Sequence, residues 1–244
     1  MSIEYSVYTN IGDCAINEDF ASAFEGSVSA YVLADGLGGH GGGDIASHLV
    51  VEAVKEIVSQ ASELSVALLD TCFTVAQEKL LARQKELNRE GALKTTLVIL
   101  LTDGKTAIWG HIGDSRLYHC RKGKVQSRTL DHSVPQMLVK LRQIKEKDIR
   151  HHEERNVLLK VMGIPWSESK MYDIDCTGMK LKKGDSFIMC SDGCWEWVED
   201  SDIAKIICQK KAVDTVAGEI GDEAYSNGMG TDRDNITALV VRIN

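Results

Sequence analysis

The sequence has no long apolar run and no recognisable leader. None of its apolar stretches approaches the roughly 18 residues needed to cross a bilayer. Residues 1–4, MSIE, have neither the basic start nor the apolar core of a signal peptide. We therefore expect no membrane association and a cytoplasmic location.

Cysteine pairs and an excess of positive charge are also missing. The seven cysteines are scattered, without the paired spacing of a zinc site or the density of a secreted disulfide scaffold. This pattern predicts reduced thiols, most of them in the core. The formal net charge of −8 argues against nucleic-acid backbones and anionic membranes as partners, and it suits a site that collects cations.

The chain contains no linker, internal repeat or low-complexity segment. No Pro/Gly/Ser-rich stretch or shift of composition divides it, and 43% of its residues are hydrophobic. That content is enough to bury one substantial core. We predict a single domain over residues 1–244, present as a monomer.

Hydrophobic periodicity predicts strands interleaved with helices. Six short runs rich in Val, Ile, Leu and aromatic residues are typical of strands, mostly in hairpins: 28–34, 93–101, 105–112, 116–120, 186–190 and 236–243. Apolar residues at three-and-four spacing predict a helical hairpin after the first run, and two further helices near 201–209 and 212–226. Such a series favours an α+β fold of antiparallel sheets with helices outside.

Residues 129–163 are more polar than their surroundings and interrupt the strand series. They contain Pro135, and we expect an excursion from the main fold there. The run HHEE at 151–154 superficially suggests a metal site, but its spacing is not HExxH and adjacent histidines point apart on a helix. We interpret this run as a solvated face.

The glycine-rich stretch at 31–47, YVLADGLGGHGGGDIAS, places an acid where a predicted strand stops. One interpretation is a tight strand-to-helix turn that Asp35 caps. The other is a phosphate or metal site, because glycines let the backbone approach a ligand. The stretch lacks the Lys-Ser/Thr of a P-loop and fits a dinucleotide fingerprint only loosely. By itself it leaves both interpretations open.

Aspartates recur at the ends of the predicted strands. Three follow such strands and two precede apolar runs: Asp35, Asp114 and Asp192, then Asp19 and Asp234. In antiparallel sheets the end of one strand lies beside the start of its neighbour, so the five carboxylates can converge on one edge. Clustered acids repel one another unless hard divalent cations neutralise them, and a sulfur-free set selects Mg²⁺ or Mn²⁺ over zinc. The alternative is five independent turn caps.

The order of motifs along the chain resembles a known family. The motifs are NED (17–19), ADGLGGHGGGDIAS (34–47), TTLVIL (95–100), GDSRLYHCRKGKVQSRTLDHS (113–133), RN…MG (155–163), CSDGCWEWV (190–198) and DNIT (234–237). This set resembles, from end to end, the bacterial PP2C-type (PPM) metal-dependent serine/threonine protein phosphatases. The resemblance implies a four-layer α-β-β-α sandwich of two antiparallel sheets flanked by helix pairs. It also implies a metal centre at one end, with 129–163 as a mobile flap beside it.

The resemblance further implies a set of ligands for two core ions, Mn²⁺ or Mg²⁺. Asp35 would bridge the two ions, and the backbone carbonyl of Gly36 would bind the second. Asp192 and Asp234 match ligands of the first ion. These three acids are therefore the predicted catalytic residues, and the glycines would let the backbone join the metal site.

Three other acids match outer positions of the family's site. Glu18 and Asp19 match residues that reach the metals largely through water, and Asp114 matches the acid that holds a third ion together with Asp192. In the implied chemistry, two ions roughly 3.5–4 Å apart lower the pKa of a bridging water, which attacks phosphorus in line. The implied substrates are phosphoserine and phosphothreonine on proteins, placed there by a serine/threonine kinase.

A cysteine-nucleophile phosphatase is the competing chemistry. The segment HCRKG at 119–123 contains a cysteine and an arginine, but it has no arginine at the position that would close a phosphate cradle. Cys120 is therefore interpreted as a strand residue.

The sequence departs from the family pattern in two ways. Cys14 and Ala15 stand where relatives usually carry an arginine that grips the substrate phosphate, two or three residues after the glycine equivalent to Gly12. Leu37 stands where animal relatives carry a histidine thought to protonate the leaving oxygen, although bacterial relatives commonly have an apolar residue there. Because arginine contacts to phosphate are strong and shape-specific, we expect weaker substrate binding around an intact metal centre.

Two alternatives to a protein phosphatase remain open, and the missing arginine motivates the first of them. One is a phosphoprotein-binding module that retains the fold and has reduced or lost turnover. The other is a two-metal phosphoesterase that acts on small molecules. Cys14 itself could be a reactive thiolate beside the cations, or it could merely fill a loop.

Overall fold

Two five-stranded antiparallel sheets form the centre of the molecule. The computed structural model describes residues 1–244 except 39–40, 167–168, 208 and 210. Sheet A has the order β1 (Ile3–Asn10), β10 (Ile236–Ile243), β9 (Ser186–Cys190), β6 (Arg116–Arg121), β7 (Lys124–Arg128). Sheet B has the order β2 (Asp19–Phe24), β3 (Ser29–Asp35), β4 (Leu97–Thr102), β5 (Thr106–Ile112), β8 (Asp173–Lys180).

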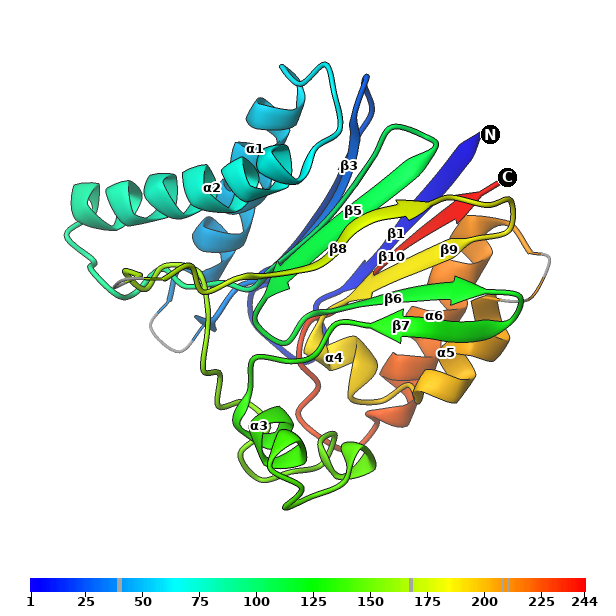
Figure 1. The fold of residues 1–244 in the computed structure, drawn as a ribbon. Coiled ribbons are helices and arrows are strands. Elements are labelled where there is room, and N and C mark those ends of the chain that lie inside the picture. Colours follow the sequence, from blue (N-terminus) through cyan, green and yellow to red (C-terminus); the bar gives the residue numbers. More distant parts are fainter. Residues whose placement is uncertain (39–40, 167–168, 208, 210) are drawn as a thin grey trace.

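Helices cover the outer face of each sheet. The hairpin of α1 (Gly43–Val58) and α2 (Val66–Glu86) packs on sheet B, and α5 (Asp200–Ile207) and α6 (Val213–Asn227) pack on sheet A (Figure 1). A single turn of helix, α4 (Asp192–Trp195), follows β9 directly. This arrangement confirms the predicted α+β sandwich of four layers.

The two-sided burial of the central strands explains why they appear in the sequence as continuous apolar runs. In β3, Tyr31 and Leu33 point into the core between the sheets, whereas Val32 and Ala34 point into the core under α1 and α2. Side chains of a strand alternate between its two faces, so a strand buried on both needs apolar residues throughout.

Four strands were not among the predicted runs, and they are the four sheet edges: β1, β7, β2 and β8. Their residues are half-buried or exposed at most positions, because an edge strand has a neighbour on one side only. The predicted strand at 93–101 begins only at Leu97. The predicted helix at 201–209 ends at Ile207, and Cys208 lies outside the described residues.

The predictions for the cysteines and for the HHEE run can be compared directly with the structure. No disulfide joins two of the described cysteines, and four of them are buried, among them Cys120 in β6. Residues 151–154 lie in turns rather than on a helix, with His151, Glu153 and Glu154 exposed. In the part of the chain that the structure describes, no helix is both long enough and apolar enough to cross a bilayer.

Residues 129–163 follow β7, an edge strand of sheet A, and precede β8, an edge strand of sheet B. They contain α3 (Val134–Lys140) and the 3₁₀ turn η2 (Glu146–Asp148), which lie below the sandwich in Figure 1. The returning segment forms isolated bridges from Leu158 to Ser133 and from Met162 to Thr95. The first bridge joins the start of the segment to its returning part, and the second joins the returning part to the residues just before β4.

Candidate metal centre

Strand ends from both sheets bring the predicted acids to one end of the sandwich. Asp19 begins β2 and pairs in register with Asp35, the last residue of β3. Asp114 follows β5, Asp192 follows β9, and Asp234 precedes β10. The prediction that all five meet on one sheet edge is wrong, because two belong to sheet B, two flank strands of sheet A, and Asp114 lies on the connection from β5 to β6.

A cavity of about 480 Å³ opens among these strand ends. Its lining includes five acids: Glu18, Asp35, Asp114, Asp192 and Asp234. Asp19 does not line the cavity and is buried behind it, with 5% of its surface exposed. The structure therefore brings six of the acids singled out in the sequence to one place.

Burial and mutual repulsion make this cluster electrostatically unfavourable by itself. Burial raises the pKa of Asp35 well above its ordinary value, and the charges of Asp19, Asp192, Asp114 and Asp234 raise it further. Burial and the Asp234 charge raise the pKa of Asp192 to about 7. Bound cations would relieve both effects, because they replace lost hydration and neutralise the repulsion.

Asp19 provides a direct test of whether the residues fit a cation. Its Oδ2 accepts a hydrogen bond of 2.7 Å from the Ser191 hydroxyl, which itself accepts one from the Thr237 amide. Its Oδ1 is buried, and no residue that the structure describes donates to it. A buried carboxylate oxygen without a partner is costly, so this oxygen fits a water or a cation in the space beside it.

The donors form an all-oxygen set that faces a cavity, and they do not form a closed cage. Among the described residues, no three acid, histidine or cysteine side chains already stand in the arrangement of a metal site. Mg²⁺ is typically bound through one or two carboxylates and keeps several waters. Oxygen ligands, uncompensated negative charge and an open cavity fit hard divalent cations of this kind.

The glycines of the β3–α1 connection permit close approach of three chain segments. A Cβ on Gly36 would lie 2.2 Å from the carbonyl oxygen of Gly43, and one on Gly38 would lie 1.8 Å from Oε2 of Glu18. The Glu18 carboxylate accepts hydrogen bonds from the amides of Gly43 and Asp44. It therefore caps α1, whose own N-cap residue contributes no side-chain hydrogen bond. Residues 39–40 of this stretch lie outside the described residues.

The backbone of Asp35 is held by the two residues just before β4. Its carbonyl accepts hydrogen bonds from the Thr96 amide and the Thr95 hydroxyl, both 2.8 Å long. Its amide donates to Oγ1 of Thr96, which is also 2.7 Å from the Ser115 hydroxyl. The TTLVIL motif thus fixes the strand end that carries Asp35, a role that the sequence pattern did not reveal.

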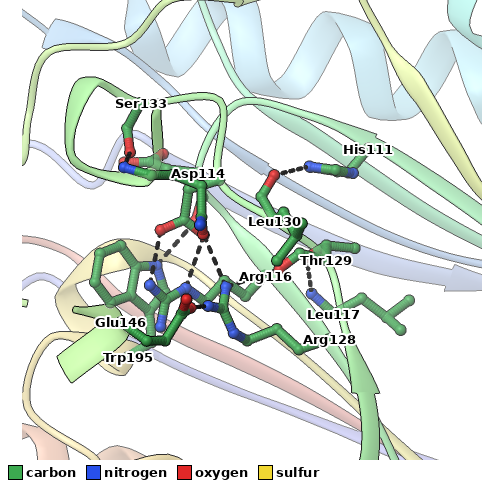
Figure 2. A network of polar contacts seen from close by, with 12 residues as sticks. His111, Asp114, Arg116, Leu117, Arg128, Thr129, Leu130, Ser133, Glu146 and Trp195 are labelled. Atoms are coloured by element: carbon green, nitrogen blue, oxygen red, sulfur yellow. Dashed lines mark hydrogen bonds and ion pairs between the residues drawn. The ribbon is translucent and has the colours of Figure 1, made fainter. Parts of the chain in front are cut away.

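A buried arginine links the base of the 129–163 segment to Asp114. Arg116 forms two hydrogen bonds with Asp131, of 2.9 and 2.7 Å. Its guanidinium lies 3.6 Å from the ring centroid of Trp195, and both side chains are labelled in Figure 2. The indole of Trp195 donates to the carbonyl of Asp114 at 2.9 Å (Figure 2). Burial alone would raise the pKa of Asp131, but Arg116 and then Arg128 hold it below its usual value.

Sequence reasoning assigned no role to this network. Arg116 and Asp131 occur within the motif at 113–133, and Trp195 within that at 190–198, so the family motifs were the only available signal. Nothing in the local pattern indicates that these three side chains meet.

The 129–163 segment also reaches the cavity itself. Asn156 and Leu158 line the cavity together with the acids. Arg155 forms an ion pair of 2.6 Å with Glu196, four residues beyond Asp192. The segment therefore borders the acid cluster, and Asn156 is a polar cavity residue that the sequence analysis did not single out.

Cys14 lies beside the acid cluster. Its sulfur is 3.6 Å from Oδ1 of Asp234, and the residue is exposed. Although the residue as a whole is exposed, partial burial of its thiol, followed by the charge of Asp234, raises the pKa of Cys14 to about 11. The protein's own groups therefore disfavour the thiolate, and the predicted reactivity would depend on bound cations alone.

Arg233 lies near Cys14, but its guanidinium is already bound by Asp13 and packed on Tyr225. Arg233 forms two hydrogen bonds of 2.8 Å with Asp13, and its guanidinium lies 3.9 Å from the ring centroid of Tyr225. Neither Cys14 nor Ala15 supplies a cation. The family resemblance implies an arginine at one of these two positions, and both hold neutral side chains.

Comparison with known proteins agrees with the fold and the motif order. The protein phosphatase 2C family model matches residues 8–217. The serine/threonine phosphatase stp of Listeria innocua is 30% identical over 236 residues, which cover 93% of this chain and 90% of the relative. A putative protein phosphatase 2C-type protein of Streptococcus pyogenes is 30% identical over 247 residues, covering 98% and 97% of the two chains.

Solved structures show the same architecture. The serine/threonine phosphatase of S. agalactiae superimposes with a TM-score of 0.85 at 28% identity, covering 100% of both chains. The catalytic domain of the phosphatase PstP in complex with two manganese ions gives a TM-score of 0.82 at 27% identity, covering 98% of this chain and 97% of that domain. The chain therefore belongs to the protein phosphatase 2C family.

Proposed function

We propose that this chain removes phosphate from phosphoserine and phosphothreonine of proteins, with Mn²⁺ or Mg²⁺ bound at the acid cluster. The observation that carries the proposal is the meeting of the acids on one cavity, where their charge is uncompensated. Relatives named serine/threonine phosphatases support the reaction, and the PstP domain with two manganese ions supports the cofactor.

We assign the residues to two core ions and a third. Asp35 would contact both core ions, with the Gly36 carbonyl on the second and with Asp192 and Asp234 on the first. Asp114 and Asp192 would hold the third ion. This assignment is supported by the cavity that all five residues line.

Two further acids would act around these ions. Glu18 and Asp19 would reach them through water. The unpaired Oδ1 of Asp19 can accept a hydrogen bond from such a water, and Glu18 keeps its contacts to the amides that begin α1.

The bound cations would supply an activated water and would neutralise the phosphoryl oxygens. The chain's own residues would hold the metal ligands and the substrate phosphate in place. Thr95 and Thr96 fix the strand end that carries Asp35, and Asn156 lies on the cavity wall where a substrate phosphate would enter. A protonated Asp192 cannot serve as a ligand, so its raised pKa makes cation binding compete with protons below about pH 7.

The same proposal extends to the substrates, the location and the oligomeric state of the chain. Its substrates would be proteins phosphorylated by a serine/threonine kinase, and the chain would act in the cytoplasm as a monomer of one domain. The composition supports the single domain, because no Pro/Gly/Ser-rich stretch divides the chain.

A second function is favoured by one specific observation. Cys14 and Ala15 stand where an arginine would grip phosphate, and Arg233 is engaged by Asp13. A chain that binds phosphoproteins with little turnover would tolerate this loss of catalytic power. A phosphoesterase of small molecules would rely less on that arginine if its substrate had other anchors.

The deciding experiment measures phosphate release from phosphoserine and phosphothreonine peptides, and from p-nitrophenyl phosphate, with titrated Mn²⁺. We expect Mn²⁺-dependent hydrolysis that EDTA abolishes. Equal rates with Mn²⁺ and with EDTA would contradict the proposal. Tight peptide binding without metal-dependent phosphate release would favour the binding module, and turnover of small phosphate esters but not of peptides would favour the small-molecule enzyme.

A further inference from the structure

A second cavity lies at the opposite end of sheet A from the acids. It has a volume of about 590 Å³ and is bordered by the far ends of β6, β9 and β10 and by the start of α6. The eight residues of β10 separate the two sites, which at about 3.3 Å per residue places them roughly 25 Å apart. The two cavities have no lining residue in common.

The three shared strands carry opposite charges at their two ends. Acids lie at one end of each strand, and the second cavity is lined by five basic residues at the other: Arg121, Lys122, Lys183, Lys211 and Arg242. A basic cluster of this density is unexpected in a chain with a net charge of −8.

Only part of this positive charge is neutralised. Arg121 pairs with Asp185 at 2.7 Å, and Lys211 pairs with Glu219. Lys122 and Lys183 are exposed and form no ion pair with any residue that the structure describes. The cavity therefore presents uncompensated cations to an incoming ligand.

Arg242 adds a donor that is already desolvated. Its Nη1 donates to the carbonyl of Lys211, whereas its Nη2 is buried and has no hydrogen-bond partner among the described residues. An unpaired guanidinium nitrogen costs free energy, which an oxyanion in the cavity would recover through a charge-assisted hydrogen bond.

The start of α6 points to the same kind of ligand. The N-cap residue, Ala212, lines the cavity and has no side chain that can cap the helix. Asp214, in the first turn, accepts hydrogen bonds from the amide and the hydroxyl of Thr215. The positive end of the helix dipole favours anions.

The cavity also has an apolar part, formed by Cys120, Ile207 and Ala212. Its volume lies in the range of small-molecule sites, about 300–1,000 Å³. From the cations, the unpaired Arg242 nitrogen, the uncapped helix and this apolar part, we infer that the cavity binds a small phosphate-bearing anion. The anion is either free phosphate or the monophosphate of a small organic molecule.

The test is calorimetric titration of the full chain in EDTA, in which the acid cluster holds no cation and its negative charge repels anions. Inorganic phosphate and adenosine monophosphate are the two probes. We expect both to bind with dissociation constants below about 1 mM. Tighter binding of the nucleotide would identify an organic monophosphate as the ligand, and equal or weaker binding would identify free phosphate.

Lys122→Glu/Lys183→Glu is the decisive variant, because it reverses two exposed charges that hold no ion pair. This variant should raise the dissociation constants of both probes at least tenfold. The control Lys85→Glu/Lys140→Glu makes the same change of charge at two exposed helix positions that do not line the cavity, and it should bind as the unmodified chain does. The inference would be overturned if the control weakened probe binding as much as Lys122→Glu/Lys183→Glu does. It would also be overturned if the unmodified chain bound neither probe at 10 mM.

The outcome is independent of the phosphatase proposal. The binding is measured without metal, so a catalytically silent chain can still bind the probes. Conversely, Lys122→Glu/Lys183→Glu should hydrolyse p-nitrophenyl phosphate with Mn²⁺ at the rate of the unmodified chain in phosphate-free buffer, and a large loss there would mean that this cavity belongs to the catalytic machinery.

Discussion

Asp19 and Asp35 stand directly opposite each other on the paired strands β2 and β3. Like charges at such a position destabilise a sheet, so the pairing is unfavourable unless something neutralises it. Both pKa values are raised by burial first and then by neighbouring carboxylates. The metal-free protein therefore holds electrostatic strain that cation binding would relieve.

Removing Asp192 should abolish most of the activity. In our assignment Asp192→Ala removes a ligand of the first and the third ion, and we expect kcat/KM to fall by at least about a hundredfold, about 2.7 kcal/mol. Asp114→Ala should be milder, because it touches only the third ion. Circular dichroism should show folded protein in both cases, and near-normal Mn²⁺-dependent turnover of Asp192→Ala would refute the site assignment.

Restoring the missing arginine should improve catalysis. Cys14→Arg would place a cation beside Asp234, where a charge-assisted contact to phosphate contributes about 1.5–3 kcal/mol. We expect kcat/KM to rise by about tenfold for each 1.4 kcal/mol realised in the transition state, with little change in Mn²⁺ affinity. Cys14→Ala is the control. An unchanged or lower kcat/KM in folded Cys14→Arg would mean that phosphate is gripped from elsewhere.

The metal-free protein should lose stability as the pH rises through the acidic range. The pKa of Asp192 is about 7 in the folded chain and near 3.9 when unfolded, so the folded state binds more protons between these values. Because the slope of the unfolding free energy follows the protons bound in the unfolded state minus those bound in the folded state, it is negative here.

This dependence can be measured as the melting temperature in EDTA at pH 5, 6, 7 and 8. Asp192→Asn should flatten the fall and raise the melting temperature at pH 8, by about 2–4 °C per kcal/mol recovered. Saturating Mn²⁺ should remove the difference between pH 7 and pH 8 in the unmodified chain. A melting temperature that rises with pH in EDTA, and rises equally in Asp192→Asn, would contradict the assignment.

Breaking the buried ion pair should destabilise the fold. Arg116→Ala leaves the buried carboxylate of Asp131 with Arg128 as its remaining ion-pair partner among the described residues, and loss of one member of a buried pair costs about 3–5 kcal/mol. The melting temperature should fall by about 6–20 °C. Arg116→Ala/Asp131→Ala should recover part of that loss, and a double variant no more stable than the single one would show that the pair is not the cause.

Adding a methyl group at Gly38 should disturb the acid cluster without unfolding the chain. The new Cβ would lie 1.8 Å from the Glu18 carboxylate, which must move away from the amides of Gly43 and Asp44. The lost cap should cost about 0.5–2 kcal/mol, and Mn²⁺ affinity should fall. Gly218→Ala is the matched control, since no atom lies within 4 Å of its Cβ in α6; it should be neutral or stabilising.

The central strands and the helix hairpin were predictable because local patterns report burial. β3 and β10 are buried on both faces and appear as apolar runs, and α1 repeats its apolar residues at helical spacing. The edge strand β1 alternates irregularly between half-buried and exposed residues, so its sequence contains no apolar run that would indicate a strand. The motif order added the candidate ligands, because each motif includes a strand end or the residues beside it.

Tertiary structure alone decided how these pieces act together. That Asp35 of one sheet faces Asp192 of the other depends on how the sheets stack, which residues 157 positions apart cannot encode locally. The capping of α1 by Glu18 depends on the register of β2 against β3. The strands determine which residues lie at their ends; layer packing determines which ends share a cavity, because contacts between distant segments depend on the register and packing of whole elements.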